Sequence, residues 1–288
     1  MTCSSDGSLR VWDLKTGEQI GDAWRNGKDG VVAIALSLEG KKVVCGCVDG
    51  AVELWDIDTG KIIAKWTGHT SCVASVSWHR DCGRVVSASR DGTARVWDVG
   101  SGKAVLAIET GLSQVQAVIY SPDTTMIATG GVSKDLKALL NIWDSKTGKL
   151  ITNLKGHTHR VSCLAWTADG STLISGSWDE SIRTWNTTTW QQIHVLTGHT
   201  EPVLDVAISP NINVPILASV SLDSTARLWN LENGLPINSP LQHPRSLPCV
   251  SFSTDGKLLV TGCWNSGAYS WDISGILEEA GLLNPNVS

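Results

Sequence analysis

Short apolar runs, each ended by a turn sequence, recur along the chain. Between residues 68 and 109 the runs VASVSWH, RVVSAS, TARVWD and KAVLAIE are separated by the turns RDCG, RDG and GSG. The runs are rich in Val and alternate apolar with small or polar residues, whereas none shows a helical period over a useful length. Short strands joined by tight turns predict a meandering antiparallel sheet of four strands.

This four-stranded unit recurs along the chain. Trp followed by Asp or Asn occurs at Trp12, Trp55, Trp97, Trp143, Trp185, Trp229 and Trp271, which places the copies 42 to 46 residues apart. A fixed period of this length is the mark of a repeat architecture. A lone four-stranded sheet cannot bury both faces, but sheets arranged around an axis pack face to face. The sequence therefore predicts an all-β fold of seven radial sheets.

The period near 42 residues and the GH…D…WD pattern closely resemble the WD40 family of β-propellers. The resemblance covers residues 1–273 and leaves 274–288 as a C-terminal tail. It implies a seven-bladed WD40 β-propeller of four-stranded antiparallel blades. It also implies a non-enzymatic scaffold or adaptor that binds other proteins or peptide segments.

The resemblance assigns a structural role to three recurring side chains. In the family pattern the indole N–H bonds to a hydroxyl on the second strand, the hydroxyl to a loop His, and the His to a turn Asp. Three blades carry the complete set: His69, Asp91 and Trp97; His157, Asp179 and Trp185; His199, Asp223 and Trp229. A buried indole needs an acceptor, which a phenyl ring does not. The repeated position accounts for seven of the 14 Trp, in a chain that has one Phe.

These motifs do not indicate a catalytic, metal or cofactor site. A Ser, His and Asp trio suggests a hydrolase, but enzymes build one nucleophilic site and here the trio recurs in several blades. The Asp after Trp is replaced by Asn186 and Asn230, so no charge is required there. The chain contains no CxxC pair and no phosphate-binding glycine loop. We therefore expect no enzyme activity, no cofactor and no metal.

Composition excludes several partner classes. The net charge is −5 and the 23 Lys and Arg are scattered, whereas a nucleic-acid binder carries a basic stripe. No apolar run is long enough to cross a membrane, and the first residues do not resemble a secretory signal. Eight Cys in 288 residues do not form a dense disulfide framework and are interpreted as reduced thiols. We expect no nucleic-acid or membrane partner and a cytoplasmic or nuclear protein.

The best candidate for a binding site is the residue that precedes each turn Asp. These residues should emerge together on one loop face around a central channel, beside the variable loops that follow each His position. The positions that we expect to contact partners are Arg90, Trp178, Leu222 and Trp264, with Arg160 and Arg245 from the loops; Ser5, Val48, Gln114, Glu201 and Pro202 share the face. Exposed aromatic and Arg residues are the usual anchors of interfaces. The alternative is that the indoles fold onto neighbouring blades.

Some blades depart from the pattern. Gly27 and Gly111 replace the loop His in blades two and four, and Cys45 and Cys47 replace Ser in blade two. Blade seven keeps His243 but has Asn265 in place of Asp. We expect these blades to be softer. Blade four also has four additional residues between its second and third strands, which predicts a longer loop. Arg10, Arg95, Arg183 and Arg227, two residues before Trp, predict contacts between blades.

The first and last blades are predicted to be incomplete. Met1 falls on a second strand, and the residues after Trp271 are more helical than strand-like. Exposed strand edges invite pairing with other chains, so self-association through these blades is expected. The chain is interpreted as a fragment or as having a divergent start. Two alternatives to a scaffold stay open: a ligand-sensing module of a larger signalling receptor, or a propeller that binds glycans or small ligands.

Overall fold

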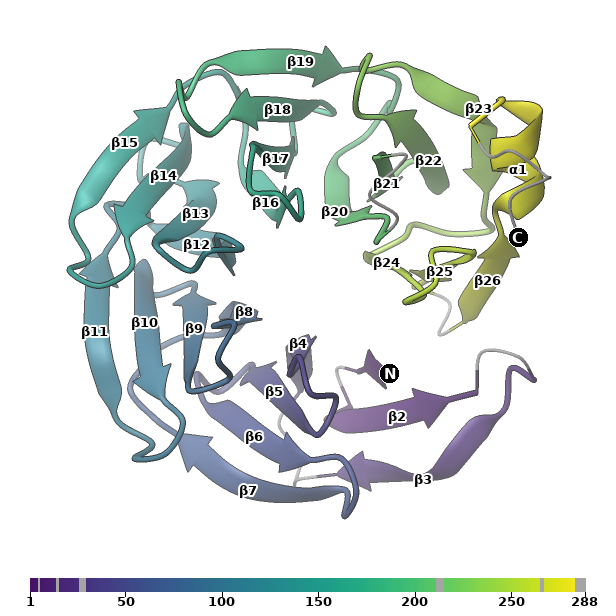
Figure 1. Ribbon diagram of the computed structural model, residues 1–288. Coiled ribbons are helices and arrows are strands. Elements are labelled where there is room, and N and C mark those ends of the chain that lie inside the picture. The colour runs from purple at the N-terminus through teal and green to yellow at the C-terminus, as the bar shows by residue number, and fades with distance from the viewer. Residues whose placement is uncertain (5, 14–15, 26–29, 211–214, 265–266, 283–288) are drawn as a thin grey trace. The chain divides into compact units, whose positions relative to one another are not determined.

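The computed structural model describes residues 1–288 except 5, 14–15, 26–29, 211–214, 265–266 and 283–288. The described residues form two compact units, Met1–Lys155 and Gly156–Ser288. Almost all of their regular structure is antiparallel β-sheet, as the runs of alternating apolar residues predict. We number the sheets in chain order as blades one to seven (Figure 1).

The first unit holds four sheets among the described residues. In each sheet the strands follow one another in chain order. Blade one has β1 (Thr2–Cys3), β2 (Ser8–Trp12) and β3 (Gln19–Arg25). Blade two has β4 (Val31–Leu36), β5 (Lys42–Cys47), β6 (Val52–Asp56) and β7 (Lys61–Trp66). Blade three has β8 (Val73–Trp78), β9 (Arg84–Ser89), β10 (Thr93–Asp98) and β11 (Ala104–Glu109). Blade four has β12 (Gln114–Tyr120), β13 (Met126–Val132), β14 (Ala138–Asp144) and β15 (Leu150–Leu154).

The second unit holds three sheets and one helix among its described residues. Blade five has β16 (Val161–Trp166), β17 (Thr172–Ser177), β18 (Ile182–Asn186) and β19 (Gln192–Leu196). Blade six has β20 (Val203–Ile208), β21 (Ile216–Ser221), β22 (Thr225–Asn230) and β23 (Pro236–Gln242). Blade seven has β24 (Cys249–Phe252), β25 (Leu258–Gly262) and β26 (Ala268–Asp272), and α1 (Ser274–Glu279) follows.

The predicted four-stranded meander is confirmed in blades two to six. Blades one and seven have three strands each in the described part of the chain, as the sequence predicts. The tail does contain a helix, whose Leu277 is buried in a cluster with Ile237 of β23. The tail boundary at residue 273 stays a prediction. The additional residues of blade four lengthen β13 and β14 to seven residues each and form the turn between them, where Leu136 is 75 % exposed.

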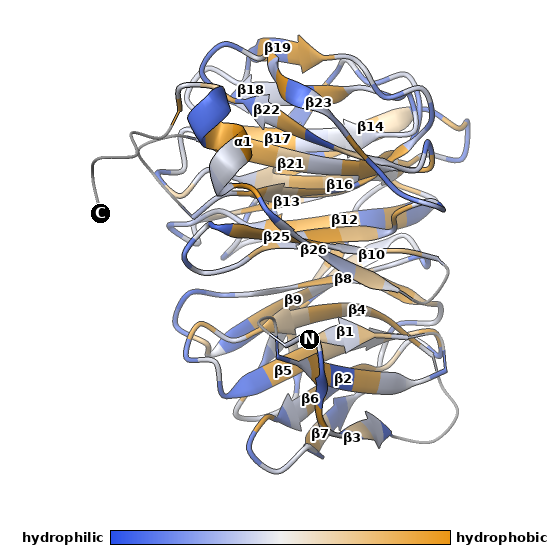
Figure 2. Cartoon of the chain, turned by 90° about the vertical axis from the view of Figure 1, so that its right-hand side faces the viewer, coloured by the Kyte–Doolittle hydropathy of each residue, from blue (hydrophilic) through white to orange (hydrophobic). Residues whose placement is uncertain are grey.

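The core of each unit lies between successive blades. In the first unit β4, β8 and β12 lie side by side and define the inner edge of the sheets, so that β7, β11 and β15 define the outer edge (Figure 1). Val86 of β9 and Ile127 of β13 are both fully buried in one cluster that joins blades three and four. The colouring in Figure 2 follows this plan, because strands are largely apolar and the connecting loops polar. Burial of one such side chain contributes roughly 1.5–3 kcal/mol.

Indole rings add to these contacts between blades. Trp66, at the end of β7, stacks on Trp97 of β10 with ring centroids 5.8 Å apart and an interplanar angle of 19°. Trp24 of β3 stacks on Trp55 of β6 in the same way, at 6.2 Å and 17°. Offset stacking of this kind stabilises a pair of rings beyond the area that they bury. The excess of Trp over Phe thus has a second structural cause besides the hydrogen-bonded WD position.

Candidate functional site

The repeated Trp, Ser, His and Asp residues meet inside each complete blade. In blade three the Trp97 indole N–H donates to Ser87 Oγ at 2.8 Å, and Ser87 Oγ lies 2.7 Å from His69 Nε2. His69 Nδ1 lies 3.0 Å from Asp91 Oδ2. Because Ser87 accepts from the indole, its own proton points to Nε2, and the Nδ1 proton of His69 points to the carboxylate.

The same network is built in blades five and six. His157 and His199 each lie 2.8 Å from a turn carboxylate, that of Asp179 or Asp223, and 2.8 Å from a hydroxyl. The indoles of Trp185 and Trp229 donate to Ser175 and Ser219 at 2.9 and 2.8 Å. The three network hydroxyls, including that of Ser87, are fully buried. A nucleophile must reach its substrate, and these hydroxyls have no access to solvent.

The carboxylates of the network are ionised. Burial raises the pKa of Asp179, but hydrogen bonds from His157, Ser181 and Thr158 hold it well below its ordinary value. Burial lowers the pKa of His69 despite the adjacent Asp91, so this imidazole is neutral at pH 7. A neutral imidazole between a hydroxyl and a carboxylate satisfies every polar atom in the chain of bonds.

Blade two replaces the network with an ion pair that the sequence interpretation missed. Lys65 Nζ on β7 lies 3.0 Å from the turn Asp49 Oδ2 and 3.3 Å from Glu53 Oε1. Glu53 is 2 % exposed and occupies the position at which other blades carry Arg. Cys45 stands where Ser87 stands in blade three, and the buried Trp55 Nε1 has no acceptor among the described residues. Gly27 lies outside the described residues.

Blades four and seven keep part of the network. In blade four the Trp143 indole donates to Thr129 Oγ1 at 2.8 Å. In blade seven His243 Nε2 lies 2.8 Å from Thr261 Oγ1, while its Nδ1 faces the Leu241 carbonyl oxygen at 3.1 Å. The Trp271 indole reaches Thr261 at 3.4 Å, which is longer than in complete blades. Asn265 lies outside the described residues. Whether these blades are softer stays a prediction.

The repeated Arg makes its contact inside a blade. A Cβ atom added to Gly68, which precedes the loop His of blade three, would lie 3.3 Å from Arg95 Nη1 and 3.2 Å from the Trp97 ring. Gly156 and Gly198 stand in the same relation to Arg183 and Arg227. The GH pair therefore needs glycine because a guanidinium and an indole lie directly against it. Each of these Arg side chains thus contacts the loop that enters its own blade, and the expected contact between blades stays a prediction.

The residues that precede the turn Asp are fixed by their backbones. Their N–H groups donate to a carbonyl oxygen of the loop that enters the blade: Val48 to Gly30 at 2.9 Å, Arg90 to Cys72 at 2.9 Å, Trp178 to Arg160 at 2.9 Å, Leu222 to Pro202 at 3.0 Å, and Trp264 to Ser246 at 3.1 Å. Ser5 lies outside the described residues. This bond holds the backbone at each position and leaves the side chain unconstrained by it.

In the second unit these positions form what we call the loop rim, namely Trp178, Leu222 and Trp264 with the loop residues Arg160 and Arg245. Trp178 is 42 % exposed and Trp264 is 65 % exposed, so neither indole is folded away. The Arg160 guanidinium carbon lies 4.7 Å from the centroid of the Trp178 ring, within cation–π distance. Arg245 is exposed and Leu222 half-buried. In the first unit Arg90 is exposed at the equivalent position.

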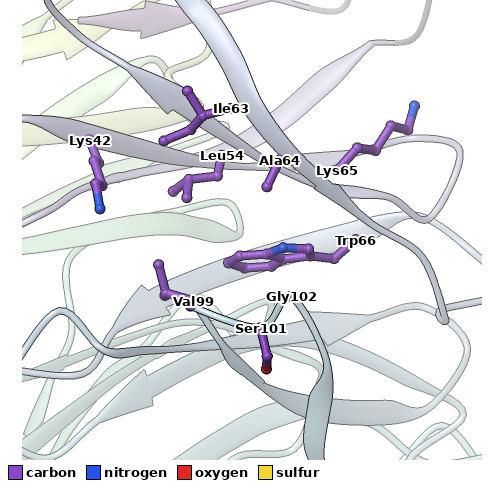
Figure 3. Close-up of a pocket in the computed structure, with 10 residues that line it drawn as sticks. Lys42, Leu54, Ile63, Ala64, Lys65, Trp66, Val99, Ser101 and Gly102 are labelled. Atoms are coloured by element: carbon purple, nitrogen blue, oxygen red, sulfur yellow. The ribbon is translucent and has the colours of Figure 1, made fainter.

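One groove has no counterpart in the sequence motifs. It lies between blades two and three, has a volume of about 460 Å³, and is lined by Lys42, Leu54, Ile63, Ala64, Lys65, Trp66, Val99, Gly100, Ser101 and Gly102 (Figure 3). Its walls come from β7 and from the turn that follows β10. Because two different repeats contribute them, no motif within one repeat indicates the groove.

The fold and the WD positions define a protein class. The family model of the WD domain, or G-beta repeat, matches residues 23–56, 60–98, 148–186, 190–230 and 236–272, which together exceed half of the chain. The chain therefore belongs to the WD40 repeat family, whose members are generally non-catalytic scaffolds. Blades one and four, which the model matches least, are the short first blade and the blade with additional residues.

Relatives of known sequence support this assignment. The chain is 27 % identical over 268 residues to the periodic tryptophan protein 2 homolog of Dictyostelium discoideum, covering 91 % of this chain and 23 % of the relative. It is 24 % identical to autophagy-related protein 16 of Arabidopsis thaliana, covering 94 % and 52 %. It is 32 % identical to the small ribosomal subunit protein RACK1 of Drosophila melanogaster, covering 57 % and 65 %. The chain thus spans about a quarter to two thirds of these relatives.

Solved structures show the same fold. A chain in the crystal structure of the mitotic checkpoint complex superposes with a TM-score of 0.82 at 20 % identity, covering 93 % of this chain and 82 % of that chain. The seven-bladed β-propeller fold is thereby confirmed. In the described ranges, no group of three or more His, Cys, Asp or Glu is placed to hold a metal ion. No helix there is long and apolar enough to cross a membrane.

Proposed function

We propose that the chain is an adaptor that binds an extended segment of another protein at its loop rim. The observation that supports this most strongly is the exposure of two indoles, with the half-buried Leu222 at the equivalent position of the blade between them. Exposed Trp residues beside Arg are the side chains that most often anchor protein interfaces. A segment laid across blades five, six and seven would contact Trp178, Leu222 and Trp264 in turn.

The electrostatics of the loop rim favour acidic groups near the anchors. Arg160 is held over Trp178, and Arg245 is exposed beside blade seven. Arg guanidinium groups bind carboxylates and phosphates through two parallel hydrogen bonds. Glu201, in the loop that enters blade six, and Glu180, in the turn between β17 and β18, reduce the net positive charge. The proposal therefore names a peptide with apolar residues and a carboxylate; a phosphorylated peptide is its narrower form.

The test compares binding by wild type with binding by Trp178→Ala, Trp264→Ala and Arg245→Glu. Each purified variant is used in a quantitative pull-down from cell extract after its thermal midpoint is shown to match wild type. The matched control is Leu235→Ala, because Leu235 is 60 % exposed at the opposite end of β22 in blade six. Selective loss of the same proteins with the rim variants supports the proposal. Equal capture by all five proteins contradicts it.

The edge of blade seven offers a second surface. β26 is the last strand of its sheet among the described residues, and its Ala268, Ser270 and Asp272 are exposed. The equivalent residues of β22 are covered by β23. We propose that an extended segment of another chain, including a second copy, can pair with β26. A Ser270→Lys substitution is expected to block that pairing.

We also propose that the protein is located in the cytoplasm or the nucleus.

The alternative of a glycan or small-ligand propeller has less support. Such a protein needs equivalent pockets in several blades, whereas the groove in Figure 3 is formed by blades two and three with Trp66 at its base. The corresponding outer-strand residues are Ile108, Leu154 and Leu196 in the next three blades. The groove is therefore not repeated chemically, which agrees better with an adaptor than with a lectin-like array.

A further inference from the structure

The outermost strand of blade three presents an uncovered apolar edge. β11 pairs with β10 on one side and ends its sheet among the described residues. Ala104, Val105 and Ala107 are exposed, and the exposed fraction of Val105 is 52 %. An exposed apolar strand with open backbone groups is a template for pairing with another strand.

The ladder to β10 leaves hydrogen-bonding groups free to act outward. The Thr110 N–H donates to the Gly92 carbonyl at 3.4 Å, immediately beyond the paired residues Thr93 and Glu109. In an antiparallel pair only alternate residues bond to the same neighbour. The same alternation from Thr110 back along the strand directs the backbone groups of Ile108 and Leu106 toward β10. Ala107 and Glu109 therefore direct their N–H and C=O groups away from it.

The outer strands of blades one, two and six carry residues that oppose edge pairing, whereas β15 and β19 (Gln192–Leu196) carry no proline and no Asp, Glu, Lys or Arg. Charged or proline residues interrupt such edges in natural sheets. The interrupting residues are Asp22 and Arg25 on β3, Lys61 and Lys65 on β7, and Pro236 and Pro240 on β23. β11 has neither charge nor proline from Ala104 to Ile108.

The charges at the two ends of β11 are complementary to each other. Lys103 precedes the strand and Glu109 ends it; both are exposed. Within the described part of the chain, neither forms an ion pair. If two copies of β11 run antiparallel with Leu106 opposite its counterpart, Lys103 of each copy lies opposite Glu109 of the other. Val105 then lies opposite Ala107.

The outer strand of the next blade, β15, has charges at its two ends that are not complementary to each other. It is also apolar at its start, since Leu150 is 53 % and Ile151 is 47 % exposed. Lys149 precedes it and Lys155 follows it. Antiparallel pairing of two copies of β15 would place Lys opposite Lys at both ends, which is unfavourable.

We propose that this chain forms a twofold-symmetric dimer in which β11 pairs antiparallel with β11 of a second copy. A twofold interface must be complementary to itself, and the Lys103 and Glu109 pattern meets this condition. The contact is small, because it consists of one strand edge on each side, so the dimer is weak and depends on protein concentration. Its association also weakens as salt rises, since the end pairs are exposed.

The test is sedimentation velocity of the full 288-residue chain at increasing concentration, with folding of each variant checked by circular dichroism. The wild-type mass is expected to rise from 30.8 kDa toward twice that value. Lys103→Glu alone and Glu109→Lys alone each place like charges at both ends, and should raise the dissociation constant about tenfold or more. An equimolar mixture of these two variants restores opposite charges and should dimerise.

Two controls separate this interface from others. Lys137→Glu, in the turn between β13 and β14, changes the net charge by the same amount and should leave association unchanged. Ser270→Lys blocks pairing through β26, and the association that remains in this variant should still be weakened by Lys103→Glu and by Glu109→Lys. The proposal is overturned if wild type stays monomeric at all concentrations, if the mixture does not associate better than its components, or if Ser270→Lys abolishes a dimer that Lys103→Glu leaves intact.

Discussion

The guanidinium group of Arg160 lies over the indole ring of Trp178, with 4.7 Å between the guanidinium carbon and the ring centroid. The same two residues are joined through their backbones, because the Trp178 N–H donates to the Arg160 carbonyl at 2.9 Å. The pair therefore presents an apolar ring and a cation as one preformed unit. Preformed contacts reduce the ordering cost that binding must overcome.

Replacing the partners of this pair should affect binding far more than folding. Trp178 is 42 % exposed and its backbone bond does not depend on its side chain. Trp178→Ala is expected to change the free energy of unfolding by less than about 0.5 kcal/mol. Urea denaturation checks this. A much larger loss would mean that the indole supports the fold, and the loop rim would lose its main anchor.

Removal of a network hydroxyl should destabilise a complete blade. Ser219→Ala deprives the Trp229 N–H of its acceptor and His199 Nε2 of its donor, both in a buried site. We expect a loss of about 2–3 kcal/mol in the free energy of unfolding. Ser251→Ala, at an exposed position of β24, provides the control and should change stability little. Similar losses for both variants would show that the network does not stabilise the blade.

Blade two offers the reverse experiment. Cys45 occupies the place of the network Ser, and Trp55 Nε1 has no acceptor in the described structure. Cys45→Ser supplies a hydroxyl there and is expected to stabilise the protein by about 1 kcal/mol relative to Cys45→Ala, which supplies none. Thermal and urea unfolding of both variants measure the difference. If the two variants are equally stable, the indole does not gain a hydrogen bond from the restored hydroxyl.

Removing only one partner of the blade two ion pair should destabilise the protein more than removing both charges. Lys65→Met leaves the Glu53 carboxylate, 2 % exposed, without the ammonium that lies 3.3 Å away. We expect a loss of about 3 kcal/mol, because an uncompensated buried charge costs more than the pair contributes. Adding Glu53→Gln to the Lys65→Met variant should restore much of this loss. A double variant no more stable than Lys65→Met would contradict the assignment.

Stability should depend on pH through Asp205 of β20. Its carboxylate accepts from the Val250 N–H of β24 at 3.0 Å and from the Val206 N–H at 2.9 Å. Burial raises the pKa of Asp205 to about 6 from 3.8, and Cys163 of β16 is a titratable neighbour on an adjoining strand. Because the folded pKa is the higher one, the stabilising contribution is complete below pH 4. It is lost as pH rises to 6, by up to about 3 kcal/mol.

The matched variant for this prediction is Asp205→Ser. Blade three has Ser75 at the equivalent position, where Ser75 Oγ accepts from the Val118 N–H at 3.1 Å. Burial lowers the pKa of His69 and His243, which makes stability rise with pH in part of the same range. The difference between wild type and Asp205→Ser in urea unfolding from pH 4 to 7 removes this common term. A difference that is constant with pH would refute the role of Asp205.

Features that follow the repeated motif could be predicted from the sequence, and features that depart from it could not. The strands, the complete networks around Ser87, Ser175 and Ser219, and the three-stranded first and last blades all follow from a pattern that is written several times. What could not be predicted depends on residues that depart from it. Lys65 approaches Asp49 only because β7 pairs with β6, and no repeat of the motif indicates that register. The contacts of Asp205 and the walls of the groove likewise arise between blades, where two different repeats meet.

The backbone bond that anchors each residue before the turn Asp has a consequence for how this protein can change over time. Because the N–H of Trp178 or Trp264 is held whatever side chain it carries, substitution at these sites does not disturb the hydrogen-bonded interior of the blade. The backbone N–H of each such residue therefore contributes to stability, whereas its side chain is available for recognition. New specificities can arise by single substitutions at the surface, and blades can be duplicated or exchanged as units without redesign of the interior.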